Sequence, residues 1–318
     1  MKRWVTLLKI FMSIALLATV FLYVDRDELV RRARQVDAAF LLWSVLLSFV
    51  MVAVSTWKWY YLLRCQGCDV PFSRLYRWYF IGYYYSCFIP SNIGGDVARG
   101  WLAAKATGSA SASAAGIFAE RFTGMVFLLM MATISPWLVP EIATKKPSVW
   151  LGSCAGIAGL AALFIVYHVA KNRSLPGLSW RVKIETFVVK LRGLLALILG
   201  DKKVFWVVTG LTALFYLLML LNVALAFRAF GLWPDVIELA AVFPIALMVA
   251  MIPVTLGNLG IAENAYVYYF GLVGMNNELS LAMGLLLRLK IFMLAFIGLC
   301  VQMREPMGKP GRLATDET

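Results

Sequence analysis

Long apolar runs, separated by short charged connectors, restrict more than any other feature how this chain can fold. The hydrophobic content is 62% of 318 residues, against about 45–50% in ordinary soluble domains. Several runs approach the roughly 20 residues that a helix needs to cross a bilayer. The sequence therefore predicts an all-α polytopic membrane protein, with a single transmembrane domain over residues 1–318. The expected full spans are residues 7–24, 38–63, 115–139, 149–170, 204–227 and 279–303.

The net charge of +13 is spread around these apolar runs. Such a distribution is typical of the positive-inside rule and of contact with anionic lipids, and it does not favour nucleic acid as a partner. Lys2 and Arg3 precede an apolar run, as in a signal peptide, but the run up to Val24 has no clear cleavage site and is expected to remain as an anchor. We expect a bacterial inner (cytoplasmic) membrane protein with both termini cytoplasmic.

Two apolar regions are interrupted by helix-breaking residues in a similar order. The first interruption, residues 87–99, contains Pro90, Gly94 and Gly95. The second, residues 253–263, begins at a proline that is followed four residues later by a glycine and then by polar groups. Proline and glycine stop helices. A broken helix at membrane depth is tolerated only where it is buried in protein or lines a cavity.

The arms beside these interruptions are too short, or too rich in small residues, for comfortable full spans. We therefore expect two re-entrant helical hairpins in addition to six full spans, with eight full spans as the alternative. With re-entrant hairpins, the amino terminus and the main basic loops share one side of the membrane. Two halves then result, about residues 7–140 and 149–303, and their odd number of crossings makes an inverted repeat. The arms are residues 78–89, 97–115, 237–252 and 262–274, and residues 180–199 are expected to lie along a membrane surface.

The first interruption has the composition of an anion site. Asp96 and Arg99 share one face of a helix that begins near Gly95. Free N–H groups of Asn92, Gly94 and Gly95, a helix N-terminus and a guanidinium each favour phosphate or carboxylate. The structural alternative is an aspartate cap with a neighbouring arginine.

Further charged residues lie in or beside the apolar runs. Arg288 and Lys290 are far from either end of their span and point to different faces, so at least one needs an internal partner. Lys58, among tryptophans at a span end, is expected to snorkel. The remaining candidates are Glu120 and Arg121, which begin a span, and Gly257, Asn258 and Glu263, where the glutamate alternatively caps its helix.

Catalytic and metal-binding patterns are not found. Cys65 and Cys68 have metal or redox spacing, but there is no second pair and His168 is the only histidine. No Ser/His/Asp set or phosphate-cradling loop occurs. We expect no cofactor, no metal and no enzymatic activity.

The stretch Ile89–Arg99, the pair Glu120-Arg121 and the run from Pro253 to Glu263 resemble a known family. It is the flippase-like transmembrane domain that forms the amino-terminal half of bacterial lysylphosphatidylglycerol synthases (multiple peptide resistance factor) and also occurs as free-standing membrane proteins. The resemblance covers nearly the whole chain, and Pro-x-x-x-Gly-Gly-Asp-x-x-Arg is its most specific block. It implies a flippase for a modified phospholipid or a lipid-linked sugar. The aminoacyl-transferase domain of the synthases is absent, so synthase activity is not expected.

The resulting hypothesis is a lipid flippase in which two hairpins hold a phosphate-bearing headgroup near the membrane midplane. Arg99 and the Asn92–Gly95 backbone are expected to bind it, with Arg121, Arg288 or Lys290 as further cations, and rocking of the two halves exposes the site to alternate leaflets. An ion-coupled transporter of a small anionic solute is one alternative. A non-transporting membrane partner of a glycosyltransferase or lipid-synthesis enzyme is another. Expected partners are the lipid substrate and a lipid-modifying enzyme, with the oligomeric state left open.

Overall fold

The computed structural model describes residues 11–12, 14–16, 18–19, 26–88, 94–145, 147–172, 198, 200–252 and 255–304. All regular structure within these ranges is helical. The helices are α2 (Arg26–Arg34), α3 (Ala38–Arg64), α4 (Phe72–Phe88), α5 (Gly94–Thr107), α6 (Ala110–Leu138), α7 (Pro140–Lys145), α8 (Pro147–Asn172), α10 (Lys202–Ala229), α11 (Val236–Ala250), the 3₁₀ turn η1 (Leu256–Asn258), α12 (Ile261–Gly271) and α13 (Asn277–Arg304).

Four of these helices, α3, α6, α10 and α13, are long and apolar enough to cross a membrane. Shorter apolar helices are α11 and the Pro147–Ala162 part of α8. The prediction of an all-α polytopic membrane protein is therefore confirmed. Most of the expected span 7–24, the break residues 89–93 and 253–254, nearly all of the amphipathic stretch 180–199 and the tail lie outside the described residues.

The charged and polar connectors begin the long helices. Asp37 accepts hydrogen bonds from the backbone N–H groups of Ala39 and Phe40 at the start of α3. Asp201 does the same for Lys203 in α10. Asp235 caps α11 and Ser109 caps α6 in the same way. Each cap satisfies N–H groups that have no partner within the helix, which is worth about 1 kcal/mol.

Two predicted boundaries need correction. Helix α4 begins at Phe72, before the predicted start of the arm 78–89. The small-residue segment 97–115 is not one arm, because α5 ends at Thr107 and α6 already begins at Ala110. Gly108 has a φ of +68°, which favours glycine, and Ser109 caps the following helix.

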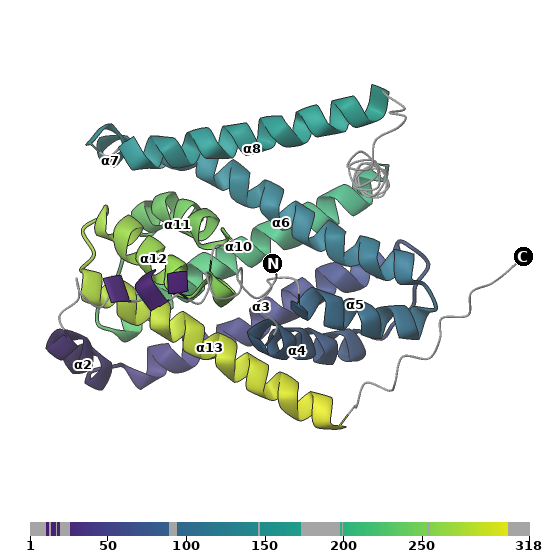
Figure 1. Cartoon of the computed structure of the whole chain (residues 1–318), viewed down its shortest axis with the longest axis horizontal. Helices are drawn as coiled ribbons and strands as arrows, with labels where there is room; N and C mark the ends of the chain where they lie inside the picture. Colours follow the sequence, from purple (N-terminus) through teal and green to yellow (C-terminus); the bar gives the residue numbers. More distant parts are fainter. Residues whose placement is uncertain are drawn as a thin grey trace, which may run out of the picture.

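Three extensive helix–helix contacts join distant parts of the chain. Helix α3 packs against α10, α4 against α13, and α6 against α11. The pairs α4–α5 and α11–α12 form hairpins, which lie at opposite ends of the bundle in the view of Figure 1. Helix α8 runs along one edge and packs against α6 (Figure 1). The α4–α5 and α11–α12 hairpins thus each lie against a long helix from the other half of the chain.

Glycines allow two of these contacts to be unusually close. A Cβ atom on Gly95 would collide with the carbonyl oxygen of Gly82 and with Ser86 across the α4–α5 hairpin. A Cβ atom on Gly298 would collide with the carbonyl oxygen of Phe80, where α13 crosses α4. At both glycines the lack of a side chain therefore lets two helix backbones approach closely.

Gly298→Ala is expected to destabilise the protein by about 1–3 kcal/mol, because the backbones of α13 and α4 must separate. The thermal unfolding midpoint in detergent measures the effect. Gly210→Ala in α10 is the matched control, since its added Cβ meets nothing within 4 Å, and alanine stabilises a helix relative to glycine. Equal midpoints for the two variants would contradict the close α4–α13 contact.

Candidate functional site

The first polar cluster joins four of the predicted site residues from α5 and α6. Arg99 donates from Nη2 to Asp96 Oδ1 at 2.8 Å and from Nη1 to Glu120 Oε2 at 2.8 Å. Arg121 donates from Nε to Asp96 Oδ2 at 2.8 Å. Asp96 therefore accepts from both guanidinium groups, while Arg99 lies between two carboxylates.

Aromatic side chains from α3 and α4 complete the surroundings of Arg99. Its guanidinium lies 4.4 Å from the ring centre of Tyr79 and 5.0 Å from that of Trp59, within the range of cation–π attraction. The Tyr79 hydroxyl donates to Glu120 Oε1 at 2.5 Å. The side chain of Arg99 is only 2% exposed and that of Glu120 6%, whereas that of Arg121 is 58% exposed.

Lys58 extends the first cluster, and the prediction that it snorkels is wrong. Its side chain is buried, and its Nζ donates to the Glu120 carbonyl and to Thr212 Oγ1, each at 3.2 Å. The ammonium group thereby links α3 to α6 and α10. The position of Lys58 near a span end suggested that its ammonium group reaches the solvent. Instead, α6 and α10 pack over that face of α3.

The second polar cluster lies between α12 and α13. Arg288 donates to Glu263 Oε1 at 2.6 Å and to the carbonyl oxygens of Gly257 and Asn258, each at 3.3 Å. Glu263 also caps α12 by accepting from the Gly260 N–H at 2.8 Å. Glu263 therefore caps its helix, as the structural alternative predicted, and it also forms an ion pair with Arg288.

The backbone of the turn before α12 adopts conformations that favour glycine and asparagine. Gly257, Asn258 and Gly260 have φ values of +55°, +58° and +81°, in a region that favours glycine and, among other residues, asparagine. This backbone turns two carbonyl oxygens toward Arg288.

The two clusters correspond in sequence spacing. Asp96 and Arg121 are 25 positions apart, and so are Glu263 and Arg288. In each case the carboxylate lies in the first turn of the second hairpin arm and the arginine lies on the next long helix. Arg99 has no such counterpart, because Tyr266 occupies the corresponding position.

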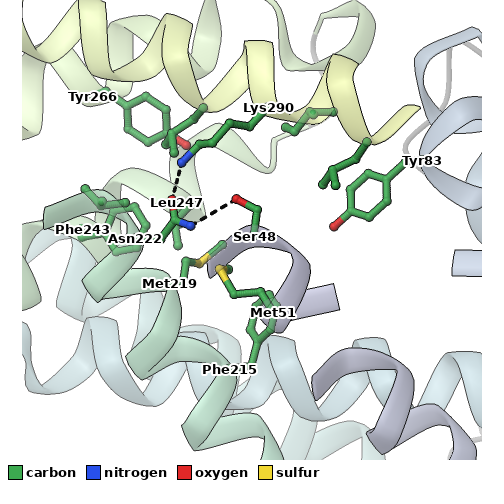
Figure 2. Close-up of a pocket in the computed structure, with 14 residues that line it drawn as sticks. Ser48, Met51, Tyr83, Phe215, Met219, Asn222, Phe243, Leu247, Tyr266 and Lys290 are labelled. Atoms are coloured by element: carbon green, nitrogen blue, oxygen red, sulfur yellow. Dashed lines mark hydrogen bonds between the residues drawn. The ribbon is translucent and has the colours of Figure 1, made fainter. Parts of the chain in front are cut away.

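Lys290 belongs to neither cluster and points into a cavity of about 190 Å³. Its Nζ donates to Ser44 Oγ at 2.7 Å and to Asn222 Oδ1, as Figure 2 shows for Asn222. Asn222 in turn donates to Ser48 Oγ at 3.2 Å. Lys290 is 4% exposed, and no carboxylate in the described part of the chain lies within salt-bridge distance of it.

The rest of the cavity wall is mainly apolar and aromatic. Met51 from α3 and Met219 from α10 form its floor, and Tyr83 and Tyr266 face each other across it (Figure 2). Tyr83 lies 6.1 Å from the ring of Tyr79, which binds Glu120. The cavity therefore lies between the two polar clusters, one wall next to each.

The structure brings the predicted residues together in three groups. Asp96, Arg99, Glu120 and Arg121 form one, Gly257, Asn258, Glu263 and Arg288 form another, and Lys290 lies in the cavity. Gly94 and Gly95 are buried in the first turn of α5, while Asn92 lies outside the described residues. Among the residues described, no three His, Cys, Asp or Glu side chains are grouped to hold a metal.

Sequence reasoning missed the side chains that hold Lys290. Ser44 and Ser48 are one helical turn apart in α3, and Asn222 is the only amide side chain in α10. A strongly polar residue within an apolar span is unusual enough to have been a signal. Their joint role depends on the α3–α10 contact, which periodicity does not predict.

The fold and these buried charges define a polytopic membrane protein with an internal polar site. The chain belongs to the family described as lysylphosphatidylglycerol synthase TM region, whose model matches residues 6–298. It is 23% identical over 306 residues to a UPF0104 membrane protein of Methanothermobacter thermautotrophicus, covering 89% of this chain and 90% of the archaeal protein. No solved structure matches. The predicted family resemblance is thus confirmed.

Proposed function

We propose that this protein is a lipid translocase, which moves a phosphate-bearing lipid between the leaflets by passing its headgroup through the Lys290 cavity. The observation that carries the proposal is a buried ammonium group at an apolar cavity, with no carboxylate beside it in the described structure. Burial of an unpaired charge is costly, so such groups in membrane proteins usually mark substrate or ion pathways. Membership of the family is consistent with a lipid-related role.

The cavity favours an amphiphile over a fully water-soluble anion. Among the described residues Lys290 is the one charged side chain that lines it, and the walls around Lys290 include Met51, Met219 and Leu247. A phosphate oxygen replaces Ser44 or Asn222 as the partner of Lys290, while the apolar wall contacts the carbon atoms next to the phosphate. A small polar solute lacks such carbon atoms and gains less from this wall.

The two hairpin clusters have a different part in the proposal. Arg99 uses three N–H groups on Asp96 and Glu120, so its charge is already balanced by carboxylates. We assign Arg99 to positioning Asp96 and Glu120 rather than to binding the headgroup. Arg121, whose side chain is the most exposed of this cluster, is the cation best placed to attract an anionic headgroup toward the bundle.

An inverted repeat gives the proposal its mechanism. The matching pairs of contacts, α4 with α13 and α11 with α6, support two halves related by an approximate twofold axis. Asp96 and Glu263 are 167 positions apart, as are Arg121 and Arg288, which supports the same repeat. Rocking of the halves about the α3–α10 contact exposes the cavity first to one leaflet and then to the other.

Lys290→Met is expected to lower lipid translocation at least tenfold, because it removes the cation and keeps an apolar chain of similar length. The measurement is the rate at which a tail-labelled fluorescent phosphatidylglycerol reaches the outer leaflet of proteoliposomes, where dithionite quenches it. Lys202→Met removes the same charge at an exposed position and serves as the matched control. Lys290→Arg retains the charge and is expected to keep part of the rate.

An unchanged rate in Lys290→Met, at equal protein incorporation, would contradict the proposal. A wild-type rate no higher than that of protein-free liposomes would contradict translocation itself. Competition by a soluble phosphate ester, without competition by lipid, would favour the small-solute alternative.

A further inference from the structure

The charge of the Lys290 cavity bears on which phospholipid headgroup can enter it, and this inference rests on the proposed function. Within the part of the chain that the structure describes, Lys290 is the one charged side chain that lines it, and no aspartate or glutamate there does so. The buried glutamates of the two polar clusters have other partners, Glu120 with Arg99 and Tyr79, and Glu263 with Arg288 and Gly260. A headgroup with an ammonium group therefore finds a like charge and no anion to pair with.

The remaining polar groups of the cavity are neutral hydroxyls and an amide. The hydroxyls of Tyr83 and Tyr266 lie at opposite walls (Figure 2), and within the described chain neither makes a hydrogen bond. Tyr266 is 9% exposed, and Tyr83 is partly exposed. Both side chains line the cavity, and each hydroxyl can donate to or accept from a hydroxyl of a ligand.

We infer that the substrate is an anionic phospholipid whose headgroup is a phosphodiester of a polyol, such as glycerol or a sugar, and that headgroups with an amino group are excluded. Lys290 pairs with the phosphate, and Tyr83 and Tyr266 bind the polyol hydroxyls. The family is described by its occurrence in lysylphosphatidylglycerol synthases, but in this chain the cavity opposes a lysyl headgroup.

The test compares the translocation rates of lipids that share one fluorescent tail and differ in headgroup. Phosphatidylglycerol is expected to move at least tenfold faster than phosphatidylethanolamine or lysylphosphatidylglycerol. Asn222→Asp, which is nearly isosteric, places a carboxylate beside Lys290. This variant is expected to slow phosphatidylglycerol and to reduce the preference against the two amino lipids.

Tyrosine variants test the polyol contacts separately from the phosphate contact. Tyr83→Phe and Tyr266→Phe are each expected to slow phosphatidylglycerol several-fold, with phosphatidic acid unchanged because it has no polyol. Tyr268→Phe is the matched control, since Tyr268 is 52% exposed on the same helix as Tyr266.

Equal rates for all headgroups in the wild type would overturn this inference and leave translocation standing. If no lipid moves, native mass spectrometry of the protein with the same lipids separates the two claims. Preferential binding of phosphatidylglycerol then supports the headgroup selectivity while translocation fails. Binding without preference overturns both.

Discussion

Replacement of Arg99 by methionine is expected to destabilise the protein by about 3–5 kcal/mol, which is the usual cost of removing one partner from a buried ion pair. Asp96 and Glu120 lose their shared cation, and the Glu120 side chain is only 6% exposed. The thermal unfolding midpoint in detergent is expected to fall by on the order of 10 °C. The cation–π contacts with Trp59 and Tyr79 are lost at the same time.

Two further variants test whether the loss of stability comes from the broken ion pair rather than from the removal of a positive charge. Lys105→Met removes a positive charge from an exposed position on the same helix, α5, and is expected to leave the midpoint nearly unchanged. Combining Arg99→Met with Glu120→Gln removes the unpaired carboxylate and is expected to recover part of the loss. A stable Arg99→Met protein that has lost translocation would instead assign Arg99 to the headgroup.

Arg288→Met is expected to have the second largest effect on stability, about 3 kcal/mol or more. The Glu263 carboxylate, whose side chain is 2% exposed, then retains only the Gly260 N–H as a partner among the contacts described. The carbonyl oxygens of Gly257 and Asn258 also lose their donor. The unfolding midpoint in detergent again measures the change.

Glu263→Gln is expected to cost less than Arg288→Met. Glutamine at this position still accepts from the Gly260 N–H and preserves the helix cap. The Arg288 side chain, 19% exposed, keeps its two carbonyl partners and some access to water. Arg304→Met, at the exposed end of the same helix α13, is the matched control. A larger loss of stability in Glu263→Gln than in Arg288→Met would contradict the expectation that the unpaired Glu263 carboxylate is the more costly of the two buried charges.

Local features of the sequence predicted much of the fold. Apolar length placed α3, α10 and α13 within a few residues of their observed bounds. The two runs with prolines and glycines follow the ends of α4 and α11. The different orientations of Arg288 and Lys290 followed from helical geometry alone. In the structure, Arg288 binds a carboxylate, whereas Lys290 binds a serine hydroxyl and an asparagine amide oxygen.

The pairing of side chains from distant helices could not be predicted in the same way. The spacing of Asp96 and Arg99 on one helix predicted their contact. Nothing in the local sequence indicates that Glu120 binds Arg99 as well, or that Lys58 lies under α6 and α10. The sequence therefore assigned the headgroup to the most distinctive motif. In the structure, carboxylates balance the charge of Arg99 in that motif. Lys290, which has no motif around it, is the cation that lines the cavity, and its described partners are a serine and an asparagine.

The claim that a lipid headgroup enters the centre of the bundle is tested most directly by photo-crosslinking. Phosphatidylglycerol with a diazirine on its headgroup is incorporated with the protein into liposomes, and the crosslinked peptides are mapped. If the headgroup enters the Lys290 cavity, we expect adducts at cavity residues such as Met51, Met219 and Leu247, and we expect these adducts to be lost in Lys290→Met. Adducts confined to outward-facing residues such as Trp206 and Phe296, which are 69% and 65% exposed, would contradict it.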